Sequence, residues 1–431
     1  MLAAHLAALL HRRGIHYAWV VAAITFLAML VTAAALGLPG ALMQPLSSEF
    51  GWSTTALSSV FATRFALYGL LGPFAAVVLL RYGVTRVVSL AAAIIGGSLL
   101  AGLFIQSLTQ AFLLWGLTLG LGTGLTAMVL GATVAGRWFV QRRGLVMGLL
   151  AGSAATGQLI FLPLAAWLIE QHGWRWALLP VATAAALVLM LVLLFMRDSP
   201  AALGLQPYGA PADATAPAAP PRADWALPFR TLAEAARHPA FWVLAGTFFI
   251  CGLSTNGLIQ THFISLCSDR GLGPVPAASV LSMMGLFDLV GTTLSGYLSD
   301  RFDNRKLLAW YYGLRGLSLF WLPYSEFTLV GLSLFAAFYG LDWIATVPPT
   351  VKLAAAEFGP ERASIVFGWV FAAHQLGAAV AAYGGGVSRS VLLSYSPALF
   401  TAGAACLVAS LAVMQLRRPQ RPPLAATAAK A

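Results

Sequence analysis

The sequence predicts an all-α integral membrane protein, with twelve transmembrane helices in two six-helix halves. Of its 431 residues, 59% are hydrophobic and only 9% are charged, whereas an average soluble domain carries about 25% charged residues. These few charges cannot cover the surface of a soluble protein of this length. Much of the surface must therefore face lipid. Long apolar runs recur along the chain, and the loops between them are alternately rich and poor in Lys and Arg. This pattern indicates repeated crossing of a bilayer.

A helix needs roughly twenty residues to cross the hydrocarbon core of a bilayer. Twelve runs meet this length. They predict helices over residues 17–39, 56–80, 86–106, 111–136, 144–169, 174–196, 240–267, 276–299, 306–324, 327–350, 362–385 and 394–416.

The basic residues orient these helices, because cytoplasmic loops carry an excess of Lys and Arg. With the N-terminus inside, twenty of the 25 Lys and Arg residues fall in cytoplasmic segments and three in outside loops, namely Arg175, Arg270 and Arg389. We therefore expect a multi-pass protein of the plasma membrane with both termini in the cytoplasm. The net charge of +11 then belongs to loops at a membrane surface, and no nucleic-acid partner is expected.

The chain divides into two halves of similar plan. Residues 1–196 and 240–416 each hold six predicted helices, residues 197–239 form a Pro/Ala-rich cytoplasmic linker, and residues 417–431 form a cytoplasmic tail. LRYGVTR and DRFDNRK occupy the same loop of each half, 220 residues apart. Two parallel repeats of this kind are typical of one large class of transporter folds.

The loop motifs carry a resemblance to a known family. GYLSDRFDNRK, from Gly296 to Lys306, resembles the loop signature of the major facilitator superfamily, and the first-half copy keeps Arg81, Gly83 and Arg86 but has Leu80 at the acidic position. RWFVQRRGLVMGLLAGSAATG, PLSSEFGWS and RDSPAALGLQPYG resemble bacterial members of the monocarboxylate and oxalate/formate porter branch. The resemblance implies a secondary transporter of the bacterial inner membrane that works by alternating access.

The same likeness suggests a gate built from the loop charges. Asp300 would accept from helix N-termini while Arg301 and Arg305 pair acids across the interface between the halves, with Arg81 and Arg86 as the first-half counterparts. Such a network could latch one state and break in the other. The alternative is that these charges only set the topology.

Four ionisable residues fall at membrane depth: Arg64, Asp288, Arg315 and Asp342. Each costs about 2.5–3.5 kcal/mol on insertion scales, so such residues usually face a cavity or a partner. Asp288 matches the acidic residue of the family's helix-eight motif, although Thr292 stands where animal members have Arg. Because burial disfavours a charged carboxylate, Asp288, with Asp342, is the candidate for proton coupling. Two structural ion pairs that fix the helix packing are the alternative.

Arg64 and Arg315 are the candidates to bind a substrate carboxylate, because a guanidinium offers a planar pair of donors. Either arginine could instead bond neighbouring carbonyls or Asp342. Gln44 stands where the branch often has a helix-one lysine, and it is a further candidate for substrate contact.

Other polar candidates lie in helices seven, ten and eleven. Asn256 and Gln260 share one helix face, and Asn256-Gly257 is an expected point of unwinding. Tyr339 shares a stripe with Asp342 next to a hinge at Pro348-Pro349. These residues and His374 could bind a polar ligand, or they could form hydrogen bonds between helices.

The predicted function is secondary transport of a small organic anion, with a monocarboxylate as the expected class, coupled to protons. Efflux of a neutral or hydrophobic compound is the first alternative, and a membrane sensor without transport is the second. The sequence has no metal-ligand spacing, no phosphate-binding loop and no nucleophile-base pair. We therefore expect no enzyme activity, no cofactor and no metal, and a monomer of two halves is sufficient.

Overall fold

The computed structural model describes residues 2–126, 128–211 and 224–416. The tail at 417–431 and the Pro/Ala-rich residues 212–223 of the predicted linker lie outside the described residues. Among the described residues up to 195, the helices are α1 (Leu2–Arg12), α2 (Ala18–Phe50), α3 (Thr54–Tyr82), α4 (Val84–Gly102), α5 (Leu108–Ala111), η1 (Phe112–Thr118), α6 (Leu119–Leu125), α7 (Met128–Trp138), α8 (Arg143–His172) and α9 (Trp174–Phe195).

The later helices include the two short pieces that follow α9. They are η2 (Pro200–Leu203), α10 (Leu227–Ala235), α11 (Pro239–Gly252), η3 (Leu253–Gln260), α12 (Thr261–Asp269), α13 (Pro274–Arg301), α14 (Asn304–Trp321), η4 (Leu322–Tyr324), α15 (Leu329–Asp342), α16 (Val347–Phe358), α17 (Pro360–Leu392) and α18 (Ser396–Val413).

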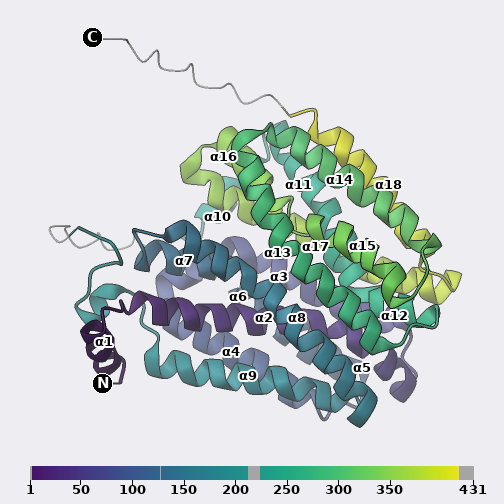
Figure 1. Cartoon of the computed structure of the whole chain (residues 1–431), viewed down its shortest axis with the longest axis horizontal. Helices are drawn as coiled ribbons and strands as arrows, with labels where there is room; N and C mark the ends of the chain where they lie inside the picture. The colour runs from purple at the N-terminus through teal and green to yellow at the C-terminus, as the bar shows by residue number, and fades with distance from the viewer. Residues whose placement is uncertain (1, 127, 212–223, 417–431) are drawn as a thin grey trace.

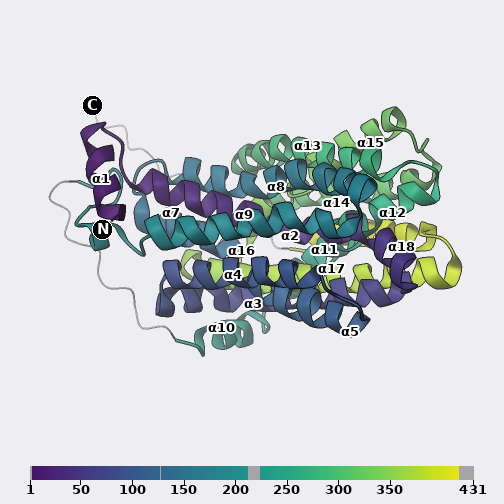
Figure 2. The same ribbon diagram turned by 90° about the horizontal axis from the view of Figure 1, so that it is seen from below.

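These elements group into twelve long segments, which confirms the predicted helical membrane fold. Ten of the segments are long and apolar enough to cross a membrane, and α3 and α14, which carry Arg64 and Arg315, complete the set. The fourth, seventh and tenth segments are each built from several pieces: α5 to α7, α11 to α12, and α15 to α16. Figure 2 shows the long helices running in nearly the same direction, with α1 at one end and α5 and α12 at the other.

Several helices extend beyond the apolar runs that predicted them. The first predicted helix ended at residue 39, whereas α2 continues to Phe50 through Pro39 and Pro45. Leu42, Met43 and Leu46 in this extension are buried. Tertiary packing therefore keeps the chain helical beyond the predicted end of the apolar run.

The helices before residue 196 lie towards the lower left of Figure 1, and those after residue 239 lie towards the upper right. Two helix pairs join these groups: α3 packs along α17, and α8 packs along α13. The backbone N–H of Thr55 donates to Ser390 Oγ at 3.3 Å. Ser282 Oγ donates to the Gln158 carbonyl at 3.3 Å. The two groups therefore meet along two seams.

Glycine permits very close approach at two helix crossings. A Cβ atom on Gly252 would overlap the His374 carbonyl oxygen, and one on Gly291 would overlap the Leu341 carbonyl oxygen. Gly252 brings α11 against α17, and Gly291 brings α13 against α15. Small residues at such crossings let helix backbones touch inside a membrane.

Candidate functional site

A cavity of about 500 Å³ lies between the two helix groups. Its wall comes from α2, α3 and α8 on one side and from α11, η3, α13, α16 and α17 on the other. The α6–α7 connection adds one lining residue, and the α15–α16 connection adds three. Predicted membrane spans supply most of this wall. The central cavity is therefore the candidate functional site.

The cavity lining includes exposed residues towards one end of the described helices. At the end that carries α1, its lining includes Gly148 of α8 and Tyr297 of α13, both of which are exposed. Towards the other end, a Cβ on Gly40 of α2 would press on the Gln260 carbonyl, and a Cβ on Gly386 of α17 would press on Ser58 of α3. Among the described residues, the cavity is thus closed on the side of α5 and α12 and reaches exposed residues on the side of α1.

The structure brings four of the predicted site residues into the cavity wall, namely Asn256, Gln260, Asp288 and His374. Asn256 and Gln260 come from η3, which is a π-helix rather than an unwound segment, so the expected unwinding is wrong. Thr261 Oγ1 donates to the Asn256 carbonyl at 2.8 Å. This bond satisfies one backbone carbonyl of the π-helix η3. Single π turns inside α-helices are frequent at functional sites.

The tenth segment breaks between α15 and α16, over residues 343–346, just before the predicted Pro348-Pro349 hinge. The freed backbone groups find partners on neighbouring helices. Asp288 Oδ1 accepts from the Ile344 N–H at 2.9 Å, and Ser295 Oγ donates to the Ala345 carbonyl at 2.5 Å. A broken helix at membrane depth needs such partners because lipid offers none.

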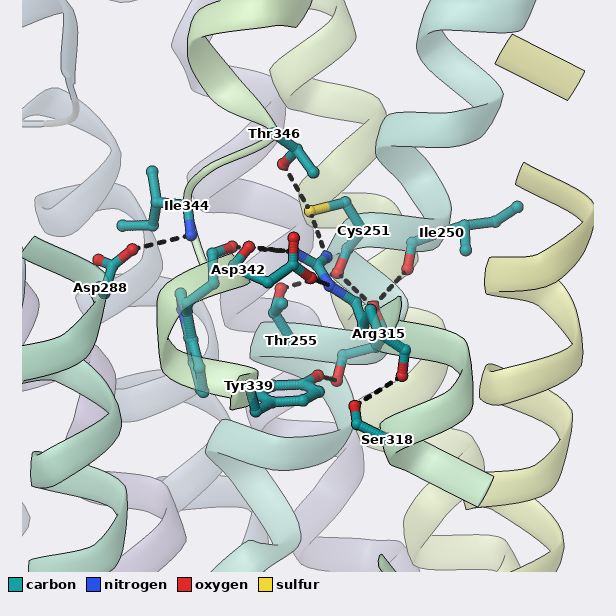
Figure 3. Close-up of polar contacts among 12 residues, drawn as sticks. Ile250, Cys251, Thr255, Asp288, Arg315, Ser318, Tyr339, Asp342, Ile344 and Thr346 are labelled. Atoms are coloured by element: carbon teal, nitrogen blue, oxygen red, sulfur yellow. Dashed lines mark hydrogen bonds and ion pairs between the residues drawn. The ribbon is translucent and has the colours of Figure 1, made fainter. Parts of the chain in front are cut away.

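Arg315 supplies the other partners of this break (Figure 3). Its Nε donates to Asp342 Oδ2 at 2.6 Å, and its Nη2 donates to the carbonyls of Asp342 at 2.5 Å and Trp343 at 3.2 Å. Its Nη1 lies 2.8 Å from Cys251 Sγ. The Arg315 side chain is fully buried and is not among the described cavity-lining residues. In this conformation Arg315 pairs with Asp342 and stabilises the α15–α16 junction.

Arg64 occupies a different kind of site. Its Nη1 and Nη2 donate to the carbonyls of Ala35 and Leu36, each at 3.1 Å, and its guanidinium lies 5.1 Å from the Phe65 ring centroid. The residue is 1% exposed, and within the described ranges no carboxylate forms an ion pair with it. Leu36 of α2 lines the cavity, and so does Tyr68, which lies one turn along α3 from Arg64. Arg64 is therefore an uncompensated buried cation directly behind the cavity wall.

Two other predicted contacts lie away from the cavity lining. Gln44 is exposed on α2, eight residues beyond the lining residue Leu36 and thus about 12 Å further along the helix axis. Tyr339 is buried, and its hydroxyl donates to the Ser254 carbonyl at 2.7 Å. In this conformation Tyr339 joins α15 to η3.

The predicted second-half gate residues form contacts within the second helix group. Asp300 pairs with Lys352, Arg301 lies over the Tyr297 ring at 4.2 Å, and Arg305 bonds Asp303 at 2.6 Å. Arg305 Nη1 also donates to the Leu416 carbonyl at 2.8 Å. The adjacent Arg305 guanidinium holds the pKa of the Asp303 carboxyl below its usual range. In this conformation Arg305 makes these local bonds, and its pairing across the interface stays a prediction.

The first-half loop obtains its acid from elsewhere in the chain. Leu80 occupies the acidic position of the motif, but Asp198, which follows α9, accepts from the Thr85 N–H at 2.8 Å. Arg81 lies near the rings of Tyr82 and Trp225, and Arg86 is exposed. The motif at residues 72–86 could not reveal Asp198, because it lies more than 100 residues away in sequence.

A helical membrane protein with a central cavity and ionisable groups at membrane depth has the features of a transporter. The chain belongs to the Major Facilitator Superfamily, whose family model matches residues 21–382. The family expected from the loop motifs is thus confirmed.

Individual relatives agree with this assignment. The chain is 32% identical to Monocarboxylate transporter 13 of Rattus norvegicus over 319 residues, which cover 73% of this chain and 68% of that protein. It is 26% identical to the Fujikurins efflux protein of Gibberella fujikuroi over 391 residues, which cover 86% of this chain and 74% of that protein. The match to the crystal structure of a D-xylose-proton symporter covers 94% of this chain and 98% of the symporter chain, with a TM-score of 0.70 and 14% identity. This last likeness is one of fold.

Proposed function

We propose that this protein transports a small organic anion, of the monocarboxylate class, together with a proton. The observation that carries the proposal is the position of Arg64, a buried guanidinium behind the cavity wall whose charge no described carboxylate balances. An uncompensated buried cation is costly, and an anion in the adjacent cavity would offset part of that cost. The similarity to monocarboxylate transporters supports the same class of substrate.

Asp288 is the proposed proton site. It lies in the cavity wall and is 4% exposed, and its carboxylate accepts from Ile344 N–H and from Thr292 Oγ1 at 2.8 Å. Burial favours the neutral form of a carboxyl group, and access to an aqueous cavity allows a proton to enter and leave. Asp342 is the second candidate, and its Oδ1 has no hydrogen-bond partner among the described residues.

The proposed cycle moves the two halves, residues 1–196 and 240–416, about the cavity, with residues 197–239 as the linker and 417–431 as a tail. The α3–α17 and α8–α13 seams provide the surfaces on which the halves rock. Asp300, Arg301 and Arg305, with Arg81 and Arg86, are the proposed gate at the α1 end. We assign that end to the cytoplasm of a bacterial cell, because most of the basic residues lie there, and we propose that one chain is sufficient.

Efflux of a neutral compound is the second candidate function. Two observations favour it: the described cavity lining contains no Lys or Arg, and the chain resembles the Fujikurins efflux protein. In that function Arg64 would only fix α3 to the carbonyls of α2.

Uptake by proteoliposomes separates these functions. Purified protein is reconstituted and supplied with radiolabelled lactate, benzoate and a neutral aromatic alcohol, and uptake is measured with and without a proton gradient. We expect gradient-driven uptake of an acid in wild type, its loss in Arg64→Gln, and its retention in Arg175→Gln, an exposed arginine that pairs with Glu49. Transport of the neutral compound alone, unchanged in Arg64→Gln, would refute anion transport.

A further inference from the structure

The cavity has an aromatic wall that the proposed function does not require. Tyr68 of α3, Phe371 and His374 of α17 and Phe248 of α11 all line it. The Tyr68 and Phe371 ring centroids lie 5.7 Å apart in an edge-to-face arrangement, Phe371 and His374 are stacked at 5.7 Å, and His374 lies 4.9 Å from Phe248. These rings offer edges and faces to a planar ligand.

Two buried polar groups belong to residues of the same wall and have no partner among the described residues. His374 Nδ1 and the side-chain oxygen of Gln375 make no hydrogen bond with any described residue, and both residues are more than nine-tenths buried. Buried polar groups are normally hydrogen-bonded, so a missing partner needs an explanation. A ligand hydroxyl supplies one, because it can donate or accept and thus fits either histidine tautomer and either amide orientation.

Gln375 is held at this position by the α3–α17 seam. A Cβ on Gly69 of α3 would overlap the Gln375 Cβ, so only glycine leaves room for the glutamine stem there. Gln375 is one of the residues that line the cavity. The polar group is therefore part of a built site rather than a surface side chain.

The spacing to the buried cation fits an aromatic acid. Arg64 and Tyr68 lie four residues apart on α3, which corresponds to about 6 Å along the helix axis. Two positions one helical turn apart can face the carboxylate and the ring of one aromatic acid. The cavity volume of about 500 Å³ also lies in the range of sites that enclose drug-sized ligands. A three-carbon acid would leave most of it to water.

We propose that the preferred substrate is a hydroxylated aromatic carboxylate. Its carboxylate faces Arg64, its ring packs against Tyr68 and Phe371, and its hydroxyl bonds His374 and Gln375. This assignment rests on the proposed transport of organic anions and specifies the substrate within that class.

The test compares four labelled acids in proteoliposomes: 4-hydroxybenzoate, benzoate, cyclohexanecarboxylate and lactate. The hydroxyl should lower the KM roughly 3- to 10-fold relative to benzoate, and the aromatic ring should lower it roughly 3- to 10-fold relative to cyclohexanecarboxylate. This series uses the wild-type protein, so it does not depend on whether a variant folds.

Variants locate each preference. Gln375→Leu should remove the advantage of 4-hydroxybenzoate over benzoate. Phe371→Leu should reduce the advantage of benzoate over cyclohexanecarboxylate. Phe400→Leu, which changes a stacked ring against Phe320 away from the cavity lining, is the matched control and should keep both preferences.

The outcomes distinguish the two proposals. Proton-linked lactate uptake without any preference for aromatic acids would overturn the substrate assignment and leave anion transport standing. Transport of no carboxylate at all would overturn both. A full set of preferences that persists in Gln375→Leu and Phe371→Leu would also contradict the assignment, because the selectivity would then arise elsewhere.

Discussion

The Asp288 carboxylate accepts a hydrogen bond from the Ile344 backbone N–H at 2.9 Å, which joins α13 to the break between α15 and α16 (Figure 3). The N–H is free to bond only because the helix is broken there. A proton added to the bonded oxygen would remove the acceptor and weaken this junction. Proton binding and the shape of one cavity wall are therefore linked in the proposed mechanism.

Asp288→Asn tests this link. The asparagine oxygen can still accept from Ile344, so the fold should persist, but the side chain no longer titrates. We expect uptake driven by an inward proton gradient to fall to its level without a gradient, while exchange of labelled for unlabelled substrate at equal pH continues. Asp269→Asn, at the closed end beside Arg389, should change neither. Full gradient-driven uptake in Asp288→Asn would exclude Asp288 as the proton site.

The buried Arg315–Asp342 pair makes a prediction about stability. Arg315→Met should lower the stability by roughly 3–5 kcal/mol, because it leaves the Asp342 charge without its partner inside the protein. Thermal unfolding in detergent measures the loss. The double variant Arg315→Met with Asp342→Asn should recover only part of it, since the carbonyls of Asp342 and Trp343 would still lack their donor.

Arg270→Met is the control for this change. Arg270 donates to the Pro323 carbonyl at 3.3 Å and is an exposed loop residue without a buried acid, so its loss should cost about 1 kcal/mol or less. Equal melting temperatures for Arg315→Met and Arg270→Met would contradict a structural role for the Arg315–Asp342 pair.

Gly252→Ala should destabilise the protein by roughly 1–3 kcal/mol, because the added methyl group would press α11 away from the His374 carbonyl. The same substitution at Gly246, also on α11, meets no atom within 4 Å and should be neutral or slightly stabilising. Melting temperatures of the two variants measure the contrast. Equal effects would mean that the α11–α17 crossing is not the constraint.

Lys352 and Asp300 form an exposed ion pair, with side chains 39% and 73% exposed. Such pairs contribute little to stability, so Lys352→Gln should lower it by less than about 1 kcal/mol. Any larger effect should appear in the rate of exchange of labelled for unlabelled substrate, because the pair fixes α16 to the end of α13 beside the exposed part of the cavity lining. A loss of stability as large as that of Arg315→Met would show that the pair is structural.

The fold was largely predictable because lipid solvates apolar side chains, so each crossing leaves a run that can be counted. The ends of helices were less predictable. The first apolar run predicted a helix that ends at residue 39, yet buried contacts of Leu42 and Leu46 carry α2 on to Phe50. The end of an apolar run does not mark the end of the helix where tertiary packing is extensive.

The candidate site was predictable in its residue types but not in its pairings. The sequence marked Arg64 and Arg315 alike as costly buried cations, whereas the structure pairs Arg315 with Asp342 and leaves Arg64 with two carbonyls. Pairing depends on which helices are neighbours, and hydropathy does not encode this. The same limit hid Asp198, which reaches the α3–α4 loop from the end of α9.

The most direct test of proton-linked anion transport is a measurement of pH inside proteoliposomes that contain a trapped pH-sensitive dye. A carboxylate is added outside at equal pH, and protein-free liposomes report passive entry of the acid. The proposed mechanism predicts faster acidification of the lumen with the wild-type protein than with Asp288→Asn or Arg64→Gln. Acidification no faster than in protein-free liposomes, while a labelled neutral compound enters through the protein, would contradict it.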